Sequence, residues 1–486
     1  MSRPSRRAAG SAADRLREEC GVVGVSTAGE PAAPIAHLAL YALQHRGQES
    51  AGIASSDGAG MWVHKAMGLV AQVFDSARIA ALPGRLAIGH VRYSTMGSAR
   101  IENAQPLRVA SPWGPLALAH NGNLINAPPL RAELEADGVA FASTTDSEVI
   151  AQLIARAPAA TVEEAVAYAM ARIEGAYTVT MVVGGRVYGF RDAHGIRPLA
   201  VGRGAGVAIL ASESCAFDHT GTVYVRDVAP GELVVLQGPH LRAVPVLAAR
   251  REAHCVFEHI YFARPDSTLA GGNVHLARRR MGQILAREHP VAADIVVAVP
   301  DSGTSAAMGF ADVSGIPFEV GLIKNRYIGR TFIQPDQPSR DLGVRLKLNP
   351  LREVLDGRRV VLVDDSIVRG TTSGKIVRML RAAGAVAVHV RISSPPIRFP
   401  CFYGIDTSSR GELVAASKSV EEIRAMIGAD SLGYLSQEGL VEALQLARGR
   451  LCMACLDGDY PTRLPDAALA GRAALEGAAL GGGRRG

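Results

Sequence analysis

The sequence predicts an α/β protein with more than one domain, and three observations support this. The chain has 486 residues, 48% hydrophobic and 20% charged, so it can form sizeable cores and is not a disordered chain. In the first half, short apolar runs alternate with turn residues, which is typical of β-rich structure with some helices. In the second half, continuous β-branched runs precede Gly, Ser or Thr turns and helical patterns, which predicts a doubly wound parallel sheet.

Changes in this pattern give the expected domain boundaries. We expect a polar, Arg-rich leader over residues 1–19, a first domain over 20–250, a second over 251–460 and a flexible tail over 461–486. Apolar sequence begins abruptly at CGVVGV, and the stretch VLAARREAHCVFEHIYFARPDS separates the two halves.

The expected elements follow in order. In the first domain we expect one helix near residues 161–173 and strands within LAIGHVRYST, LALAHNGNL, YTVTMVVGGRVYGF, VAILASES and GELVVLQ. In the second domain we expect strands at IVVAVP (295–300), VVLVDD (360–365) and VAVHVRI (386–392), with a helix in KIVRMLRAAG after the second of these.

Charge and hydropathy exclude several classes of function. The net charge is +6, but no run of five or six Lys and Arg occurs, so we expect no nucleic-acid partner. Arginine suits bidentate capture of small phosphates and carboxylates. No apolar run approaches the length of a membrane span, and the first 19 residues lack the apolar segment of a secretory signal, so we expect a cytoplasmic protein without membrane contact.

The most informative segment is VVLVDDSIVRGTTS, residues 360–373. A buried strand would end in two carboxylates, Asp364 and Asp365, followed by a Gly- and Thr-rich loop that opens a helix. Such a loop offers N–H and hydroxyl donors to a phosphate, and the carboxylates can accept hydrogen bonds from two vicinal hydroxyls. The pattern predicts a ribose 5-phosphate site. The alternatives are a plain turn with a helix cap, and a Walker A loop whose spacing this segment does not match.

This segment resembles the signature of the type I phosphoribosyltransferases, which bind phosphoribosyl pyrophosphate (PRPP). The resemblance extends to PDSGTS (300–305), whose equivalent binds pyrophosphate, and it implies a Mg²⁺ site framed by Ser302, Asp364 and Asp365. The irregular, basic stretch over 324–349 is interpreted as a lid that neutralises the pyrophosphate. The implied PRPP-binding residues are Asp364, Asp365, Arg369, Gly370, Thr371, Thr372, Ser373, Lys324, Arg326 and Lys347.

Cys20 lies where the leader meets apolar sequence. A lone cysteine is more often a packed small side chain than a nucleophile. Downstream, however, QHRGQESAGIA (44–54), GHVRYST (89–95), HNGNL (120–124) and TDSE (145–148) resemble the glutaminase domains of N-terminal nucleophile amidotransferases. That resemblance implies an N-terminal nucleophile hydrolase αββα sandwich and cleavage after Glu19. The freed α-amine, with a pKa near 7.7–8, would then act as the base for the thiol.

Further roles follow from the same resemblance. Asn121 and Gly122 would form the oxyanion hole, Arg92 would pair with the α-carboxylate of glutamine, and Asp146 would hold its α-ammonium. Tyr93 and Thr95 would be neighbours of the pocket. Without the motifs, Arg92 and Asp146 would be interpreted as a surface ion pair.

Four further cysteines suggest a metal site. The CxxC at Cys452 and Cys455 is compatible with zinc, a redox dithiol or coincidence, and spacing alone favours zinc for four thiolates. The contexts of Cys255, Cys401, Cys452 and Cys455 resemble those in the cluster-bearing branch of the glutamine PRPP amidotransferases, which implies a 4Fe–4S cluster with a structural or oxygen-sensing role. Cys215 is expected to be a core residue.

The resemblance to this family covers about residues 20–460. It implies conversion of PRPP, glutamine and water to 5-phosphoribosylamine, glutamate and pyrophosphate, the first committed step of de novo purine (IMP) biosynthesis. It also suggests a homotetramer and feedback inhibition by purine nucleotides. Another N-terminal-Cys amidotransferase, such as a hexosamine-phosphate synthase, would lack the Asp-Asp loop. A PRPP-binding regulatory protein would need neither Cys20 nor a glutamine pocket.

Overall fold

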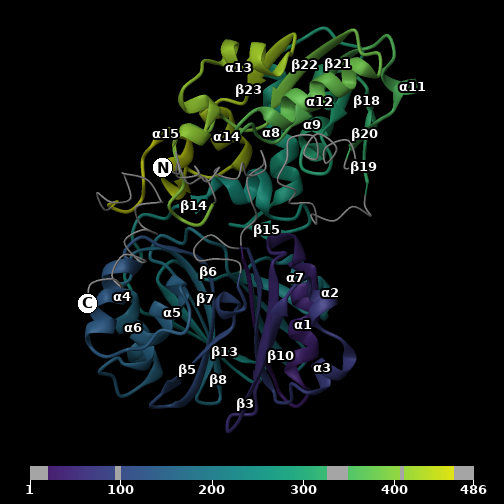
Figure 1. Ribbon diagram of the computed structural model, residues 1–486. Coiled ribbons are helices and arrows are strands. Elements are labelled where there is room, and N and C mark those ends of the chain that lie inside the picture. Colours follow the sequence, from purple (N-terminus) through teal and green to yellow (C-terminus); the bar gives the residue numbers. More distant parts are fainter. Residues whose placement is uncertain (1–19, 94–99, 326–347, 406–409, 465–486) are drawn as a thin grey trace, which may run out of the picture. The chain divides into compact units, whose positions relative to one another are not determined.

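The computed structural model describes residues 20–93, 100–325, 348–405 and 410–464 (Figure 1). The chain forms two compact units, each assembled from separate segments. The larger unit takes the described parts of 18–277, 399–410 and 444–486, and the smaller unit those of 278–398 and 411–443. No helix in the described ranges is both long and apolar enough to cross a membrane.

This division differs from the predicted boundary between residues 250 and 251. Residues 251–277, 399–410 and 444–464 fold with the first domain, because short elements pair there across long stretches of chain. One such pair is β14 (His254–Cys255) with β24 (Leu451–Cys452), which run parallel.

Two antiparallel sheets form the centre of the larger unit. The first has the strand order β11-β9-β10-β1-β4-β2-β3. Its strands are β1 (Gly21–Thr27), β2 (Ser50–Ser56), β3 (Met61–Met67), β4 (Leu86–Arg92), β9 (Ala200–Gly204), β10 (Val207–Ala211) and β11 (Val223–Asp227). The second has the order β13-β12-β8-β7-β6-β5. Its strands are β5 (Leu107–Ser111), β6 (Gly114–Leu124), β7 (Gly175–Val183), β8 (Arg186–Arg191), β12 (Glu232–Gln237) and β13 (His240–Pro245).

Helices cover the outer face of each sheet. On the first sheet lie α1 (Ala32–Ala42), α2 (Val70–Val73), α3 (Ser76–Ala80) and α7 (Cys215–Thr220), with η1 (Gln44–Arg46) after α1 (Figure 1). On the second lie α4 (Ala127–Ala136), α5 (Asp146–Ala155) and α6 (Val162–Arg172), with η2 (Ile101–Asn103) before β5. Helix α6 matches the prediction for 161–173 and begins with a capping box between Thr161 and Glu164.

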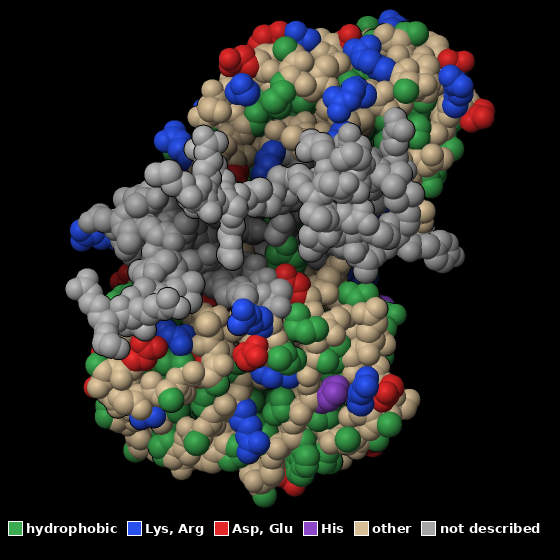
Figure 2. Space-filling view, in the orientation of Figure 1, with side chains coloured by type: hydrophobic (Ala, Val, Ile, Leu, Met, Phe, Trp, Pro, Cys, Tyr) green, Lys and Arg blue, Asp and Glu red, His purple; other side chains and the backbone are tan. Residues whose placement is uncertain are grey.

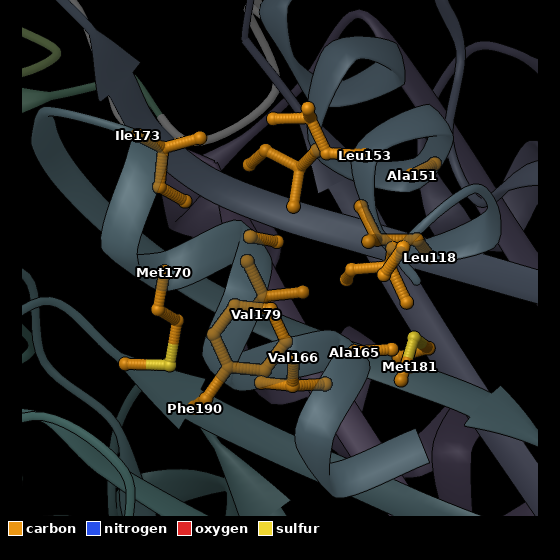
Figure 3. Close-up of a cluster of buried hydrophobic side chains, with 14 of the residues drawn as sticks. Leu118, Ala151, Leu153, Ala165, Val166, Met170, Ile173, Val179, Met181 and Phe190 are labelled. Atoms are coloured by element: carbon orange, nitrogen blue, oxygen red, sulfur yellow. The ribbon is translucent and has the colours of Figure 1, made fainter. Parts of the chain in front are cut away.

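The alternation of side chains along the strands produces three apolar layers. In β1, Val22 contacts the opposite sheet, whereas Val23 and Val25 contact the helices, as the two-residue period of a strand requires. Figure 3 shows the layer between the second sheet and its helices, where Val179 and Phe190 from the strands meet Val166 and Met170 from α6. The predicted αββα sandwich is confirmed.

The remaining elements of the larger unit are short. They are β14, β24, β15 (Thr268–Leu269), β16 (Gly272–Asn273), the π-helix η3 (Glu258–Phe262), η6 (Arg448–Arg450) and α15 (Ala454–Asp457). The π-helical turn begins at Glu258, shortly after Cys255, and turns of this rare type occur often at functional sites.

The smaller unit has a five-stranded parallel sheet, as predicted, in the order β18-β17-β21-β22-β23. Its strands are β17 (Ile295–Ala298), β18 (Phe318–Glu319), β21 (Arg359–Asp364), β22 (Ala387–Ile392) and β23 (Ser431–Tyr434), and β19 (Leu322–Lys324) pairs separately with β20 (Leu348–Pro350). The helices are α8 (Val274–Glu288), α9 (Thr304–Ser314), α11 (Arg352–Leu355), α12 (Thr371–Ala382), α13 (Val420–Ile427) and α14 (Gln437–Leu444), with η4 (Arg410–Glu412) and η5 (Val414–Ala416).

The strand order reverses between β17 and β21, because the chain passes from β17 outward to β18 and then returns to the other side of β17. Ligands of doubly wound sheets bind at such a point, beyond the carboxyl ends of the two strands. In the space-filling view, Lys and Arg side chains on the visible face of each unit are scattered among other types rather than gathered into one patch (Figure 2).

Candidate active sites

Cys20 directly precedes β1 and is buried. Its thiol donates a hydrogen bond to the carbonyl oxygen of Tyr93, with an Sγ–O distance of 3.3 Å. Burial raises the pKa of the thiol to about 11, although the Tyr93 contact and the positive charge of Arg92 act in the opposite direction. At neutral pH this thiol is therefore protonated and needs a base before it can attack a substrate.

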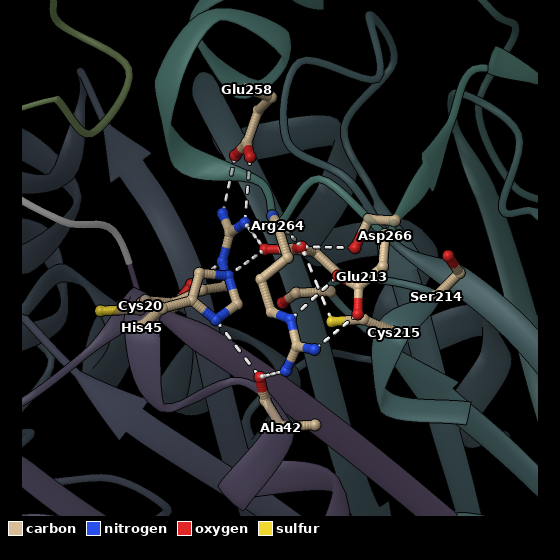
Figure 4. A network of polar contacts seen from close by, with 12 residues as sticks. Cys20, Ala42, His45, Glu213, Ser214, Cys215, Glu258, Arg264 and Asp266 are labelled. Carbon is tan, nitrogen blue, oxygen red and sulfur yellow. Dashed lines mark hydrogen bonds and ion pairs between the residues drawn. The ribbon is translucent and has the colours of Figure 1, made fainter. Parts of the chain in front are cut away.

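Arg46 fixes the backbone of Cys20. Its Nε donates to the Cys20 carbonyl oxygen at 3.1 Å, and its terminal nitrogens bind the carboxylates of Glu213 at 2.6 Å and Glu258 at 2.7 and 2.9 Å. Figure 4 shows Cys20, Glu213 and Glu258 in this network of polar contacts. His45 also contacts Glu213, at 2.7 Å. Burial opposes ionisation of Glu213, but His45 and Arg46 outweigh this effect and lower its pKa. No role for Arg46 was predicted from the sequence, although this residue lies in the QHRG segment of the first glutaminase motif.

Asn121 and Gly122 lie in β6, on the strand that pairs with β7. Asn121 is buried, and its side-chain nitrogen has no hydrogen-bond partner among the residues that the structure describes. Gly122 has a φ of +140°, and a Cβ there would lie 2.0 Å from the carbonyl oxygen of Ala176. Position 122 therefore requires glycine, and the Asn121 amide is a donor available to a developing oxyanion.

The backbone of His120, the residue before Asn121, is hydrogen-bonded through both its N–H group and its carbonyl oxygen. The backbone N–H of His120 donates to Gln105 Oε1 at 2.7 Å, and the ring Nε2 of His90 lies 3.1 Å from the His120 carbonyl oxygen. The His120 ring contacts Ser147 at 3.1 Å, and Gln105 also binds Ser147. These buried contacts position the start of the proposed oxyanion hole, and the sequence carried no local signal for them.

Arg92 and Asp146 are both buried. Arg92 ends β4, which pairs with β1 next to Cys20, and its guanidinium lies 3.4 Å from the carboxylate of Glu49. Asp146 opens α5, and its Oδ2 accepts a hydrogen bond from the Leu124 backbone at 2.9 Å. The charges of Arg92, Glu49 and Asp146 all act on the Cys20 thiol, so the fold brings these residues together. Thr95 lies outside the described residues.

In the smaller unit, the two loops singled out from the sequence meet at the reversal of the strand order. PDSGTS follows β17, and the Asp-Asp segment ends β21. A Cβ on Gly303 would lie 2.5 Å from the carbonyl oxygen of Val363 and 3.3 Å from Cα of Asp364, so the loops are in direct backbone contact. Ser302 Oγ is buried and has no hydrogen-bond partner within the described ranges.

Asp364 and Asp365 are both buried at this point. Asp364 Oδ1 accepts from the Asp365 backbone N–H at 3.0 Å, and Asp365 Oδ1 accepts from the Ser366 hydroxyl at 2.5 Å. Gly370 precedes α12, whose first turn contains the predicted phosphate-binding residues Thr371, Thr372 and Ser373. The first N–H groups of a helix lack intrahelical partners, so this turn offers donors to an anion.

The basic residues predicted around this site are only partly described. Lys324 binds Asp301 at 2.6 Å, where both side chains are exposed, and Arg369 binds Glu412 at 2.7 Å. Arg326 and Lys347, with most of the predicted lid, lie outside the described residues.

The four cysteines proposed as cluster ligands gather in the larger unit. The pairing of β14 with β24 places Cys255 opposite Cys452. Burial raises the pKa of Cys455 well above its usual value, and Cys401, Cys255 and Cys452 raise it further, which shows that the four thiols are neighbours. In the described part of the chain, no three or more His, Cys, Asp or Glu side chains are spaced to hold a metal ion.

Groups around these thiols suit sulfur ligands. The backbone N–H of Tyr403 donates to Cys401 Sγ at 3.4 Å, and a terminal nitrogen of Arg197 lies 3.7 Å from Cys255 Sγ. Donors to sulfur stabilise the thiolate form that a metal requires. Cys215 is instead the first residue of α7 and lies in the core that this helix shares with α1, with its thiol 3.8 Å from Glu213.

Comparisons with known proteins agree with this arrangement. A family model described as "Glutamine amidotransferase domain" matches residues 90–219. The amidophosphoribosyltransferase of Synechococcus elongatus is 51% identical over 459 residues, covering 93% of both chains, and that of Archaeoglobus fulgidus is 52% identical over 454 residues, covering 92% of this chain and 98% of the relative.

A solved structure shows the same likeness. The glutamine PRPP amidotransferase of Bacillus subtilis, in complex with ADP and GMP, matches with a TM-score of 0.87 and 48% identity, covering 92% of this chain and 98% of that one. The chain therefore belongs to the amidophosphoribosyltransferases, the glutamine-dependent enzymes that catalyse the first step of purine biosynthesis.

Proposed function

We propose that the larger unit releases ammonia from glutamine at Cys20, and that the smaller unit transfers this ammonia to PRPP at Asp364 and Asp365. The products are 5-phosphoribosylamine, glutamate and pyrophosphate. The observation that carries the proposal is the Cys20 thiol, buried within reach of the charges of Arg92 and Asp146. These are the two groups that free glutamine needs for its α-carboxylate and α-ammonium.

In the first half-reaction, cleavage after Glu19 frees the α-amine of Cys20, which accepts the thiol proton. The Sγ atom attacks the amide carbon of glutamine, and Asn121 with Gly122 stabilises the oxyanion. The C–N bond then breaks, ammonia leaves with the proton from the amine, and water hydrolyses the thioester to glutamate. The side-chain nitrogen of Asn121 has no hydrogen-bond partner among the described residues, which supports its role as the donor.

In the second half-reaction, Asp364 and Asp365 accept hydrogen bonds from the ribose hydroxyls. The loop from Arg369 to Ser373 holds the 5-phosphate at the start of α12, and PDSGTS holds the pyrophosphate. Ammonia attacks C1 as the bond from C1 to the pyrophosphate oxygen breaks. We propose that Lys324, Arg326 and Lys347 neutralise the departing charge.

Mg²⁺ is the proposed cofactor of this second site. The hydroxyl of Ser302, which is buried and has no partner in the described part of the chain, and the two carboxylates are the hard oxygen donors that Mg²⁺ prefers, directly or through water and substrate oxygens. When bound, the ion would neutralise charge on the pyrophosphate. These three residues would hold it beside the backbone contact between Gly303 and Val363.

A 4Fe–4S cluster on Cys255, Cys401, Cys452 and Cys455 is the proposed cofactor of the larger unit. Four neighbouring thiols with N–H donors to sulfur support it, and zinc on the same thiolates is the alternative. The cluster would link three separate segments of the chain. Iron and sulfide analysis of anaerobically purified protein distinguishes the two metals.

Regulation and assembly are further parts of the proposal. The Bacillus subtilis structure holds ADP and GMP, which supports feedback inhibition of this enzyme by purine nucleotides. We further propose a homotetramer in the cytoplasm.

The division of labour between the units is tested with Cys20→Ala. This variant should lose all phosphoribosylamine formation from glutamine and keep formation from added ammonium, because only the first half-reaction uses the thiol. Cys215→Ala, which removes a core thiol of the same unit, should keep both activities. Equal loss of both activities in Cys20→Ala, at unchanged folding by circular dichroism, would contradict the proposal.

A further inference from the structure

A continuous series of buried polar contacts joins the cysteine group to the nucleophile. Its four members are Cys255, Arg197, Glu258 and Arg46, and it ends on the carbonyl oxygen of Cys20. All lie within the larger unit, and the contacts between them are given by the structure at each step. None of the motifs recognised in the sequence assigns a role to Arg197 or Glu258.

Arg197 forms the end of the series at the cysteine group. A terminal nitrogen lies 3.7 Å from Cys255 Sγ and 3.6 Å from Glu258 Oε1. Nε and the other terminal nitrogen both donate to the Tyr403 carbonyl oxygen, at 2.9 and 2.7 Å, and the Tyr403 N–H contacts Cys401 Sγ. One guanidinium thus holds the segments of two of the four cysteines.

Glu258 and Arg46 form the other end. Glu258 opens the π-helix η3 and binds Arg46 with both carboxylate oxygens, at 2.7 and 2.9 Å. Arg46 then donates to the Cys20 carbonyl at 3.1 Å. This last contact does not involve the residues before Cys20, so removal of the leader would leave its atoms in place.

Because these charged groups are buried, the position of each depends on the contacts that its neighbours in the series make. Arg46 and Arg197 are among the largest fully buried side chains, and Glu258 lies between them. Loss of one partner strongly destabilises a buried ion. If the side chain at one end of the series moves, the side chains that contact it therefore have to move as well.

From this geometry we infer that Arg197 and Glu258 are positioning residues, which make the placement of Cys20 depend on the state of the cysteine group. The inference rests on the proposed roles of Cys20 and of the four cysteines. When the thiols bind their metal, Cys255 and the Tyr403 segment hold Arg197, and Arg197 holds Glu258 against Arg46. When the metal is lost, these contacts rearrange and the Cys20 carbonyl loses a fixed partner.

The test compares Glu258→Gln with Glu252→Gln in the processed, full-length enzyme. Glu252 lies in the same segment but pairs with Arg450 and His254 instead of the series. We expect Glu258→Gln to lower kcat for glutamine hydrolysis about tenfold to a hundredfold, since partners that support a site typically have effects of this size. The KM for glutamine should stay within about twofold, because Arg92 and Asp146 are not in the series, and ammonium-dependent activity should not change. Arg197→Lys should act like Glu258→Gln, because lysine lacks the planar fork.

A second readout does not depend on activity. The rate at which iodoacetamide modifies Cys20, measured on its peptide by mass spectrometry, is compared before and after anaerobic removal of the metal by a chelator. We expect about a tenfold decrease in the wild-type protein and in Glu252→Gln. In Glu258→Gln the rate should already be low and should not respond to removal of the metal.

Three outcomes would overturn the inference. They are equal kcat values for Glu258→Gln and Glu252→Gln, a change confined to the KM for glutamine, and the same response to metal removal in both variants. Failure of the proposed function would look different, because Cys20→Ala would then keep its glutamine-dependent activity whatever Glu258→Gln does.

Discussion

The carboxylate of Asp146 accepts a hydrogen bond from the backbone N–H of Leu124, with an Oδ2–N distance of 2.9 Å. Leu124 ends β6, the strand that contains Asn121 and Gly122. The group proposed to hold the ammonium of glutamine therefore also anchors the strand proposed to stabilise the oxyanion. In the proposed mechanism, recognition of the substrate and stabilisation of the transition state would share this one carboxylate.

Asp146→Asn separates these two tasks. The amide oxygen can still accept from Leu124, but the negative charge that faces the substrate ammonium is lost. We expect the KM for glutamine to rise about tenfold to a hundredfold, which corresponds to about 1.5–3 kcal/mol for a hydrogen bond to a charged group. Steady-state kinetics with glutamine and with ammonium provide the measurement. Asp137→Asn, at an exposed site after α4, is the control, and an unchanged KM in Asp146→Asn would refute this role.

The thiol of Cys20 should respond to pH differently before and after removal of the leader. While Glu19 is attached, burial keeps the pKa of Cys20 near 11, so the alkylation rate should rise about tenfold per pH unit from pH 7 to 10. A chain that begins at Cys20 has a free amine beside the thiol and should react faster at pH 7. Iodoacetamide labelling of both chains, followed by peptide mass spectrometry, measures this. Identical rates at pH 7 would argue against the amine as base.

The buried His90 should make the folded protein less stable in acid. Burial lowers its pKa from 6.5 to about 3. Between these values the unfolded chain binds a proton that the folded chain does not, so stability is lost as the pH falls below 6.5. At pH 5 this amounts to about 2 kcal/mol.

Urea unfolding at pH 7.5 and pH 5 measures this effect. His90→Gln removes the titrating group. The decrease in the free energy of unfolding from pH 7.5 to pH 5 should therefore be smaller in this variant than in the wild-type protein, by about 2 kcal/mol. His240→Gln changes an exposed histidine and should behave like the wild-type protein. An equal pH dependence in His90→Gln and wild type would show that His90 does not control it.

Gly303→Ala should disturb the PRPP site specifically. The new Cβ would lie 2.5 Å from the Val363 carbonyl oxygen, so one of the two loops has to move, at a cost of about 1–3 kcal/mol. We expect kcat/KM for PRPP in the ammonium-dependent reaction to fall at least about tenfold. Gly411→Ala, where a Cβ meets none of the described residues within 4 Å, should have no effect. Similar values for the two variants would show that the backbone contact is not needed.

Local patterns in the sequence were sufficient to predict individual elements. The β-branched runs at 295–300 and 360–365 predicted β17 and β21 to within two residues, because a strand buried on both faces needs continuous apolar side chains. The helix expected near 161–173 is α6, and its start follows the Thr161–Glu164 capping box. Motifs close to strand ends then gave the candidate residues of both sites.

Contacts between distant parts of the chain could not be predicted in this way. Arg46 and Glu258 are 212 positions apart, and no periodicity in either segment indicates that a buried ion pair forms between them. The same holds for β14 and β24, which are too short to have a pattern and which move residues 251–277 into the larger unit. The two loops proposed to bind PRPP meet because β17 and β21 are neighbours in the sheet. This strand order depends on the whole smaller unit, so no local pattern could predict it.

The pairing of β14 with β24 has a consequence for biosynthesis on the ribosome. The chain leaves the larger unit after residue 277, completes most of the smaller unit, and returns at 399–410 and again at 444. The glutaminase half consequently lacks its last strand and two of its four clustered cysteines until nearly the whole polypeptide has been translated. A nascent chain therefore cannot complete the fold of its larger unit before the smaller unit has been synthesised.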